Sequence, residues 1–287
     1  MKLEGRRRST NVEDRRRSGG KTAAGLGIGG IVVAALFAWI MGGDPLQVIT
    51  SQLGEVVMQG GGGAEYVPTA EEDAMKVFAD QILAGTEDAW TKEFEKMGRK
   101  YVPPKMVLFT GATSSGCGSA SKQTGPFYCP GDQTVYIDLS FFDQMRTQLG
   151  AGGDFAYAYV IAHEVGHHVQ YLLGTLQEVQ TKQRRMSQKE SNQLNVRLEL
   201  QADFYAGIWA YHEHKIWDSL EAGDIEEGLN AASAIGDDRL QMQQQGYTVP
   251  DAFNHGTSAQ RARWLKKGAS AGRFADGDTF SPAYNSL

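Results

Sequence analysis

Cysteine is scarce in this sequence, because the 287 residues include only Cys117 and Cys129. A cysteine zinc site is therefore disfavoured, since no C-x-x-C pair is present. Both cysteines lie in a segment rich in Gly, Ser and Thr, where their spacing allows one disulfide to close. A pair of free buried thiols is the alternative.

Histidine is also scarce, at six residues, yet two of them stand four positions apart in His163-Glu164-Val165-Gly166-His167. The preceding run is apolar and compatible with a helix, which would place both imidazoles on one face beside a carboxylate. Such a set can bind Zn²⁺ and activate its water, as in the core of a metalloprotease. A polar helix face is the alternative. His168 points elsewhere on such a helix and is predicted to be a hydrogen-bonded or surface histidine.

A third histidine at the spacing of the extended zinc motif is absent, because those positions hold Gln170 and Leu173. Catalytic zinc takes three protein ligands, so a distant carboxylate is expected. Glu199 is the predicted ligand, and Asp203, one helical turn later, is predicted to orient a ligand histidine. The reverse assignment, with Asp203 on the metal, is the alternative. Apolar neighbours argue against a solvated acidic face here.

A longer pattern around these residues resembles the neutral zinc metallopeptidase family of bacterial membrane-anchored proteins. It runs nearly end to end, through KLEGR at 2–6, GPFYCP at 125–130, VYIDLSFF at 135–142, AYVIAHEVGHHVQ at 158–170, ELQAD at 199–203, IGDDR at 235–239 and HGTSAQR at 255–261. The resemblance implies a zincin-like fold of the glutamate-ligand type with Zn²⁺ as cofactor, and it implies no substrate. Phe204 stands where cysteine is expected in the family, which leaves the zinc assignment unaffected.

Charge is absent from residues 22–43, and no basic residue occurs between Lys21 and Lys76. As a helix this run would span about 30 Å, which predicts one transmembrane anchor. Residues 1–21 form a basic arm, so the positive-inside rule predicts a single-pass protein with a cytoplasmic N-terminus and an extracytoplasmic catalytic domain, periplasmic in a Gram-negative cell. A cleaved signal peptide is the alternative. Nucleic acid is not a predicted partner, because the rest of the chain is acidic.

Beyond the anchor, a Gly-rich linker is predicted over residues 44–68 and a peptidase domain over 69–287. The domain is expected to be α+β, mostly helical with a small sheet. A capping box at Thr69 predicts a helix that ends at Gly85, and a second helix is expected to end at Gly98. Strands are predicted over 105–110 and 133–139. The second, or a strand near it, is expected to be a substrate-aligning edge, and an ordinary interior strand is the alternative. Further helices are expected over 140–149, 155–173, 191–214, after 224 and over 258–267, with the tract 177–193 either a solvated helix or a flap.

Together these features predict a zinc-dependent endopeptidase acting on peptide or protein substrates. Glu164 is the predicted general base. His255 is predicted either to stabilise the negative oxygen that forms or to cap the next helix. Arg261 is expected to bind a substrate carboxylate or to pair with an acidic neighbour. One rival function is a catalytically silent, zinc-binding scaffold or quality-control binding protein tethered to the membrane, against which Glu164 argues. Another is hydrolysis of a non-peptide amide. The sequence gives no indication of oligomeric state.

Overall fold

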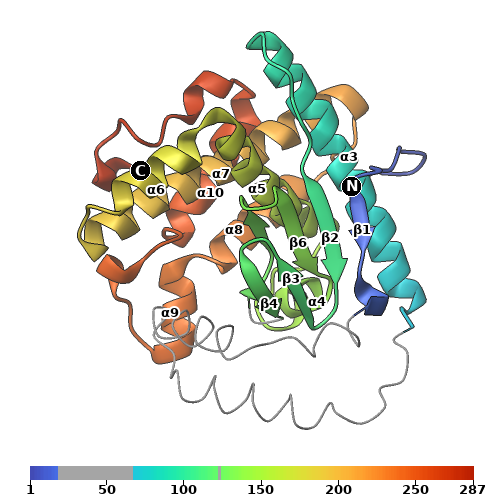
Figure 1. Cartoon of the computed structure of the whole chain (residues 1–287), viewed down its shortest axis with the longest axis horizontal. Helices are drawn as coiled ribbons and strands as arrows, with labels where there is room; N and C mark the ends of the chain where they lie inside the picture. Colours follow the sequence, from blue (N-terminus) through green and yellow to red (C-terminus); the bar gives the residue numbers. More distant parts are fainter. Residues whose placement is uncertain (19–66, 122–123) are drawn as a thin grey trace.

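A small mixed sheet packs beside a larger group of helices in this protein (Figure 1). The computed structural model describes residues 1–18, 67–121 and 124–287. The main sheet has the order β1-β2-β6-β5, with β1 (Val12–Asp14), β2 (Lys105–Phe109) and β6 (Thr134–Asp138) parallel and β5 (Phe127–Cys129) antiparallel. A separate hairpin is formed by β3 (Ala112–Ser115) and β4 (Gly118–Ser121).

The helices account for most of the described chain, which confirms the predicted α+β, mostly helical class. They are α3 (Ala70–Lys96), α4 (Ser140–Thr147), α5 (Asp154–Leu173), α6 (Thr175–Gln183), α7 (Gln188–Trp217), α8 (Asp224–Ala234), α9 (Asp237–Gln245) and α10 (Ser258–Ala271). The tract at 177–193 is a helix, α6, followed by the first turns of α7, and most of its side chains are exposed. The structure therefore agrees with the prediction of a solvated helix, and not with that of a flap.

The predicted substrate-aligning edge is wrong for β6, because β6 pairs with β2 on one side and β5 on the other. All five residues of β6 are buried, as expected for an interior strand. The strand next to β6 at one edge of the sheet is β5, which contacts α5.

Helix α3 begins at the predicted capping box, in which Thr69 accepts from the backbone N–H of Glu72. It then continues through Gly85, where the sequence predicted a stop. A Cβ atom on Gly85 would lie 2.4 Å from Oε2 of Glu213 on α7. This glycine therefore serves close helix packing, and the predicted break into two helices is wrong.

Close packing also explains a glycine near the end of α10. A Cβ on Gly268 would lie 2.2 Å from the backbone oxygen of Phe204, and one on Gly207 would lie 2.3 Å from the backbone oxygen of Leu265. The two glycines allow α10 to pack directly on α7, which carries the predicted carboxylate ligand. Helix α10 therefore continues to Ala271, with Gly272 as its cap, beyond the predicted end at residue 267.

The first eighteen residues belong to the peptidase domain. Strand β1 pairs in parallel with β2, with Val12 opposite Met106. Arg6 forms a two-pronged ion pair with Glu213, whose side chain is only 1% exposed, and its guanidinium lies 4.4 Å from the ring centroid of Trp217. The predicted separate basic arm at residues 1–21 is therefore wrong for residues 1–18.

Other arginines of this segment are also neutralised within the domain. Arg7 pairs with Glu87 and Asp88 of α3, and Arg16, which is 2% exposed, pairs with Asp73 at the start of the same helix. Positive charges that suggested a membrane-facing arm thus bind acidic side chains of α3.

The α-ammonium of Met1 lies in an acidic cluster at the starts of α5 and α8. Its nitrogen is 2.6 Å from Asp154, 3.2 Å from Glu221 and 3.5 Å from Asp224. Oxygens of Asp154, Asp224 and Glu227 lie within 4.8 Å of one another, a spacing that suits a cation. Burial lowers the pKa of this ammonium, but its acidic partners raise it overall. The ammonium itself therefore supplies the positive charge at this cluster.

The predicted anchor at residues 22–43 lies outside the described residues, as does nearly all of the predicted linker. Within the described residues, no helix combines the length and apolarity needed to span a membrane. The pairing of β1 with β2 nevertheless bears on orientation, because residues 1–18 and the peptidase domain share one sheet. One crossing between them would place them on opposite sides of a membrane. The predicted orientation, with the N-terminus and catalytic domain separated, is therefore inconsistent with this fold.

The predicted disulfide is present, joining Cys117 in the β3–β4 turn to Cys129 of β5. The bond links the hairpin to the edge of the main sheet.

Replacing both cysteines with serine is expected to lower the free energy of unfolding by about 2–4 kcal/mol, because the unfolded chain loses a loop constraint. Denaturant unfolding of the oxidised protein and the double variant measures the difference. Equal midpoints would contradict a stabilising role, and reduction of the wild type should reproduce the variant.

Candidate metal centre

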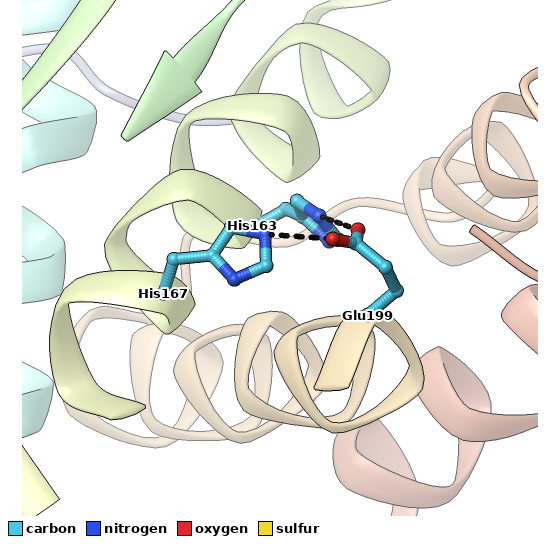
Figure 2. A group of neighbouring side chains, drawn as sticks. All are labelled: His163, His167 and Glu199. Carbon is cyan, nitrogen blue, oxygen red and sulfur yellow. Dashed lines mark hydrogen bonds and ion pairs between the residues drawn. The ribbon is translucent and has the colours of Figure 1, made fainter. Parts of the chain in front are cut away.

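Helix α5 brings the two histidines of the HEVGH segment to one face, toward helix α7 (Figure 2). The helix is buried around most of its circumference and ends at Gly174, which adopts a left-handed conformation with φ of 87°. Nε2 of His163 lies 3.2 Å from Glu199 Oε2, and Nε2 of His167 lies 3.5 Å from Glu199 Oε1. The structure thus brings together the three residues predicted as ligands, from two separate segments.

These three side chains fit a zinc ion. Their donor atoms, two imidazole nitrogens and one carboxylate oxygen, lie within 4.8 Å of one another. Neighbouring ligands in a tetrahedral zinc site are about 3.3 Å apart, given bonds of about 2.0–2.1 Å. The separations of Glu199 from His163 and His167, 3.2 and 3.5 Å, are close to this value. A set of three leaves one coordination position for water or substrate, which is typical of catalytic zinc.

The ionisation of Glu199 suits a cation site. Burial raises the pKa of Glu199, but attraction by His167 and hydrogen bonds from both histidines hold it well below its usual range. Burial lowers the pKa of His167, but the contact with Glu199 raises it overall. A metal ion at this position would therefore meet an ionised carboxylate and would compete with protons for the histidines.

Asp203 lies behind His163, where it was predicted. Its Oδ1 is 2.7 Å from His163 Nδ1, and it also accepts a hydrogen bond from the Tyr159 hydroxyl at 2.5 Å. Burial lowers the pKa of His163, but Asp203, together with the hydrogen bond to Glu199, raises it to about 10. The carboxylate thus directs Nε2 of His163 toward the metal position. The alternative, Asp203 as the direct ligand, does not agree with this geometry.

Arg261 of α10 pairs with Asp203, which decides between its two predicted roles. Its Nε and Nη2 donate to the two oxygens of Asp203 at 2.9 and 3.0 Å, and its side chain is 3% exposed. A guanidinium so enclosed cannot bind a substrate carboxylate. It compensates the negative charge of Asp203. Burial raises the pKa of Asp203, but Arg261 and His163 lower it overall.

Glu164 lies between the two histidines in sequence and is 8% exposed. Among the residues that the structure describes, its carboxylate has no hydrogen-bond or ion-pair partner. Its negative charge is one of the causes that raise the pKa of His167, so the carboxylate lies near that ligand. Without a structural partner it is available to accept a proton from water.

His255 is held by an aspartate that the sequence analysis did not single out. Nδ1 of His255 lies 3.1 Å from Asp237 Oδ1, while the other oxygen of Asp237 accepts the backbone N–H groups of residues 254–256. Burial lowers the pKa of His255, but this hydrogen bond and the attraction of Glu199 and Asp237 raise it. The cap of α10 is Thr257, so the predicted alternative of a helix-capping His255 is wrong.

His168 is not part of this centre, as predicted. It is fully buried, accepts a hydrogen bond from the Tyr128 hydroxyl at Nδ1 and donates from Nε2 to the Val102 carbonyl. Burial lowers its pKa to about 4. A neutral imidazole with both nitrogens engaged is a structural residue.

Comparison with known proteins agrees with the geometry of this centre. The family model described as "Putative neutral zinc metallopeptidase" matches residues 1–280. The chain belongs to this family. The protein YpfJ of Escherichia coli (strain K12) is 50% identical over 289 residues, covering 98% of this chain and 99% of YpfJ. The protein Rv2575 of Mycobacterium tuberculosis (strain ATCC 25618 / H37Rv) is 45% identical over 193 residues, or 64% of each chain. No solved structure gives a significant match.

Membership of the neutral zinc metallopeptidase family implies zinc as the metal and peptides or proteins as substrates. The match begins at residue 1, in agreement with a fold in which residues 1–18 supply a strand of the main sheet.

Proposed function

We propose that this protein is a zinc-dependent endopeptidase of zincin-like fold, with His163, His167 and Glu199 as the metal ligands. The observation that carries the proposal is that His163, His167 and Glu199 converge at spacings that suit zinc, while the Glu164 carboxylate, whose charge acts on His167, has no partner among the described residues. Zinc bound there would polarise a peptide carbonyl and make a water molecule more acidic.

The remaining steps are assigned to side chains of the protein. Glu164 accepts a proton from the attacking water and then delivers it to the leaving amine. Asp203 keeps His163 in the tautomer whose Nε2 faces the metal. His255, oriented through Nδ1 by Asp237, presents Nε2 as a donor for the oxygen that becomes negative.

The test is zinc content and casein cleavage by the full chain. Residues 1–18 must be retained, because they supply β1. We expect about one zinc per chain, loss of cleavage after chelation and recovery when zinc is restored. Zinc binding without cleavage of any peptide would favour the catalytically silent scaffold. Cleavage that survives complete zinc removal would refute the proposal.

Replacing His255 with alanine is expected to lower kcat by about 10²–10³-fold, because one donor to the developing negative charge is lost. Zinc content should stay at the wild-type value, since His255 is not among the proposed ligands. His214→Ala, a change in an exposed residue near the end of α7, is the matched control and should retain full activity. An unchanged kcat in His255→Ala would remove this residue from the mechanism.

The proposal includes attachment to a membrane through residues 22–43. It is supported by the apolar, uncharged composition of this run, and attachment does not require the single crossing that would separate β1 from β2. Because β1 and β2 share a sheet, we expect single cysteines placed at the exposed positions Thr10 and Ser270 to react with an impermeant maleimide from the same side of the membrane. Labelling from opposite sides would contradict the pairing of β1 with β2. Full solubility of the whole chain would contradict the attachment.

A further inference from the structure

Gln170 lies directly behind His167 on helix α5. Its Oε1 is 2.9 Å from His167 Nδ1, and the glutamine is fully buried. Its amide nitrogen lies 2.7 Å from the Leu198 carbonyl and 3.1 Å from Gln201 Oε1. Since both neighbours of the nitrogen are acceptors, the amide can face only one way, with Oε1 toward the imidazole. Nδ1 of His167 must then carry a proton, so Nε2, on the side of Glu199, is the nitrogen that is left to bind a metal ion.

The same amide joins two proposed ligands from different helices. Oε1 of Gln170 holds His167 of α5, while Nε2 holds the carbonyl of Leu198, the residue before Glu199 on α7. One buried side chain therefore contacts both a ligand histidine and the segment that carries the ligand carboxylate. Gln170 occupies the position at which the extended zinc motif has glycine, and a glycine there could make neither contact.

The polar contacts continue in one direction beyond Gln170. Gln201, which is 7% exposed, accepts from Gln170 and donates from its own Nε2 to the Gly277 carbonyl at 3.1 Å. Each amide in this chain of hydrogen bonds accepts with its oxygen and donates with its nitrogen. Gln201 does not contact His167. A substitution of Gln201 therefore breaks the hydrogen bonds beyond Gln170 but leaves the contact between Gln170 and the imidazole in place.

The two histidines are supported by different chemistry. A carboxylate, Asp203, faces Nδ1 of His163, whereas a neutral amide faces Nδ1 of His167. Both partners fix the tautomer and the ring plane, but only the carboxylate strengthens the imidazole as a donor through its charge.

We propose that Gln170 is a positioning residue that sets the orientation and the tautomer of His167 for metal binding. This inference rests on the proposed zinc site, but zinc affinity tests it separately from catalysis. Loss of a hydrogen-bond partner behind a metal-bound histidine typically lowers metal affinity about 10–100-fold.

The experiment compares Gln170→Met, Gln170→Glu and Gln201→Met in the full chain. Zinc affinity is measured by competition with a chromogenic chelator, and the visible spectrum of the Co²⁺-loaded protein reports the ligand field. Gln170→Met removes the acceptor for His167 and should weaken zinc binding about 10–100-fold, with an altered Co²⁺ spectrum. Gln170→Glu keeps an acceptor at the same reach and should stay within about threefold of wild type. Gln201→Met, which leaves His167 untouched, should do the same.

Wild-type zinc affinity in Gln170→Met would overturn the inference. It would also be overturned if Gln170→Glu or Gln201→Met lost as much zinc affinity as Gln170→Met. The loss would then come from the hydrogen bonds between α5 and α7, and not from the contact with His167. If Gln170→Met fails to fold, Gln170→Glu decides alone. Retained affinity with an altered Co²⁺ spectrum supports the contact, while an unchanged spectrum or a tenfold loss contradicts it. Absence of zinc binding in the wild type would instead refute the proposed function.

Discussion

Glu164→Gln is expected to lower kcat/KM for peptide hydrolysis by about 10²–10⁴-fold, the usual contribution of a general base. Glutamine has nearly the same shape but cannot accept the proton of the attacking water. The carboxylate of Glu164 has no partner among the described residues, so the substitution should leave the fold and the metal ligands unchanged. Steady-state cleavage and zinc content of the two proteins give the comparison.

The matched control is Glu178→Gln on α6, where an exposed glutamate pairs with Lys182. It makes the same chemical change on the surface and should retain wild-type activity. Equal activity in Glu164→Gln and wild type would end the general-base assignment. Loss of zinc in Glu164→Gln would show that the residue serves the metal and not the proton transfer.

Arg6→Met is expected to lower the free energy of unfolding by about 3–5 kcal/mol, the cost of breaking a buried ion pair from one side. Arg6 is the partner of Glu213, which is 1% exposed and lies against α3 at Gly85. Without the guanidinium, a buried carboxylate would lose its principal compensating charge. Denaturant unfolding followed by circular dichroism measures the loss.

Arg8→Met provides the control, because Arg8 is exposed and has no ion-pair partner among the described residues. It removes the same charge from the same segment and should change stability by less than about 0.5 kcal/mol. If the two variants unfolded alike, residues 1–18 would not be held on the domain as the structure places them.

The metal centre could be predicted from sequence because its key spacing is local. His163 and His167 share a helix face by virtue of a separation of four residues, and Glu199 stood out as a carboxylate on an apolar helical segment. Asp203 followed from the same helix geometry one turn later. Each of these inferences needed only helical periodicity and the ligand preferences of zinc.

The partners that lie across helices could not be predicted in this way. Asp237 reaches His255 only because α9 and the loop at 254–256 meet in the fold, and the amide of Gln170 meets the carbonyl of Leu198 only where α5 packs on α7. Asp237 was visible within the resemblance at residues 235–239, yet nothing local assigned it a role.

The position of the N-terminal segment was missed for a related reason. β1 has only three residues, Val12–Asp14, and two of them are acidic, so it lacks the apolar alternation that identifies a strand. Its arginines suggested a basic cytoplasmic arm because their partners Glu87, Glu213 and Asp73 are distant in sequence. Gly85 likewise suggested a helix end because the close approach of Glu213 cannot be read from the chain.

The most direct test of this account is the coordination sphere of the zinc-loaded full chain, determined by crystallography with anomalous scattering at the zinc edge. We predict Nε2 of His163, Nε2 of His167 and the carboxylate of Glu199 at about 2.0–2.2 Å from the ion, with one position open to solvent. Zinc bound by Asp203, or enclosed by four protein side chains, would contradict the account.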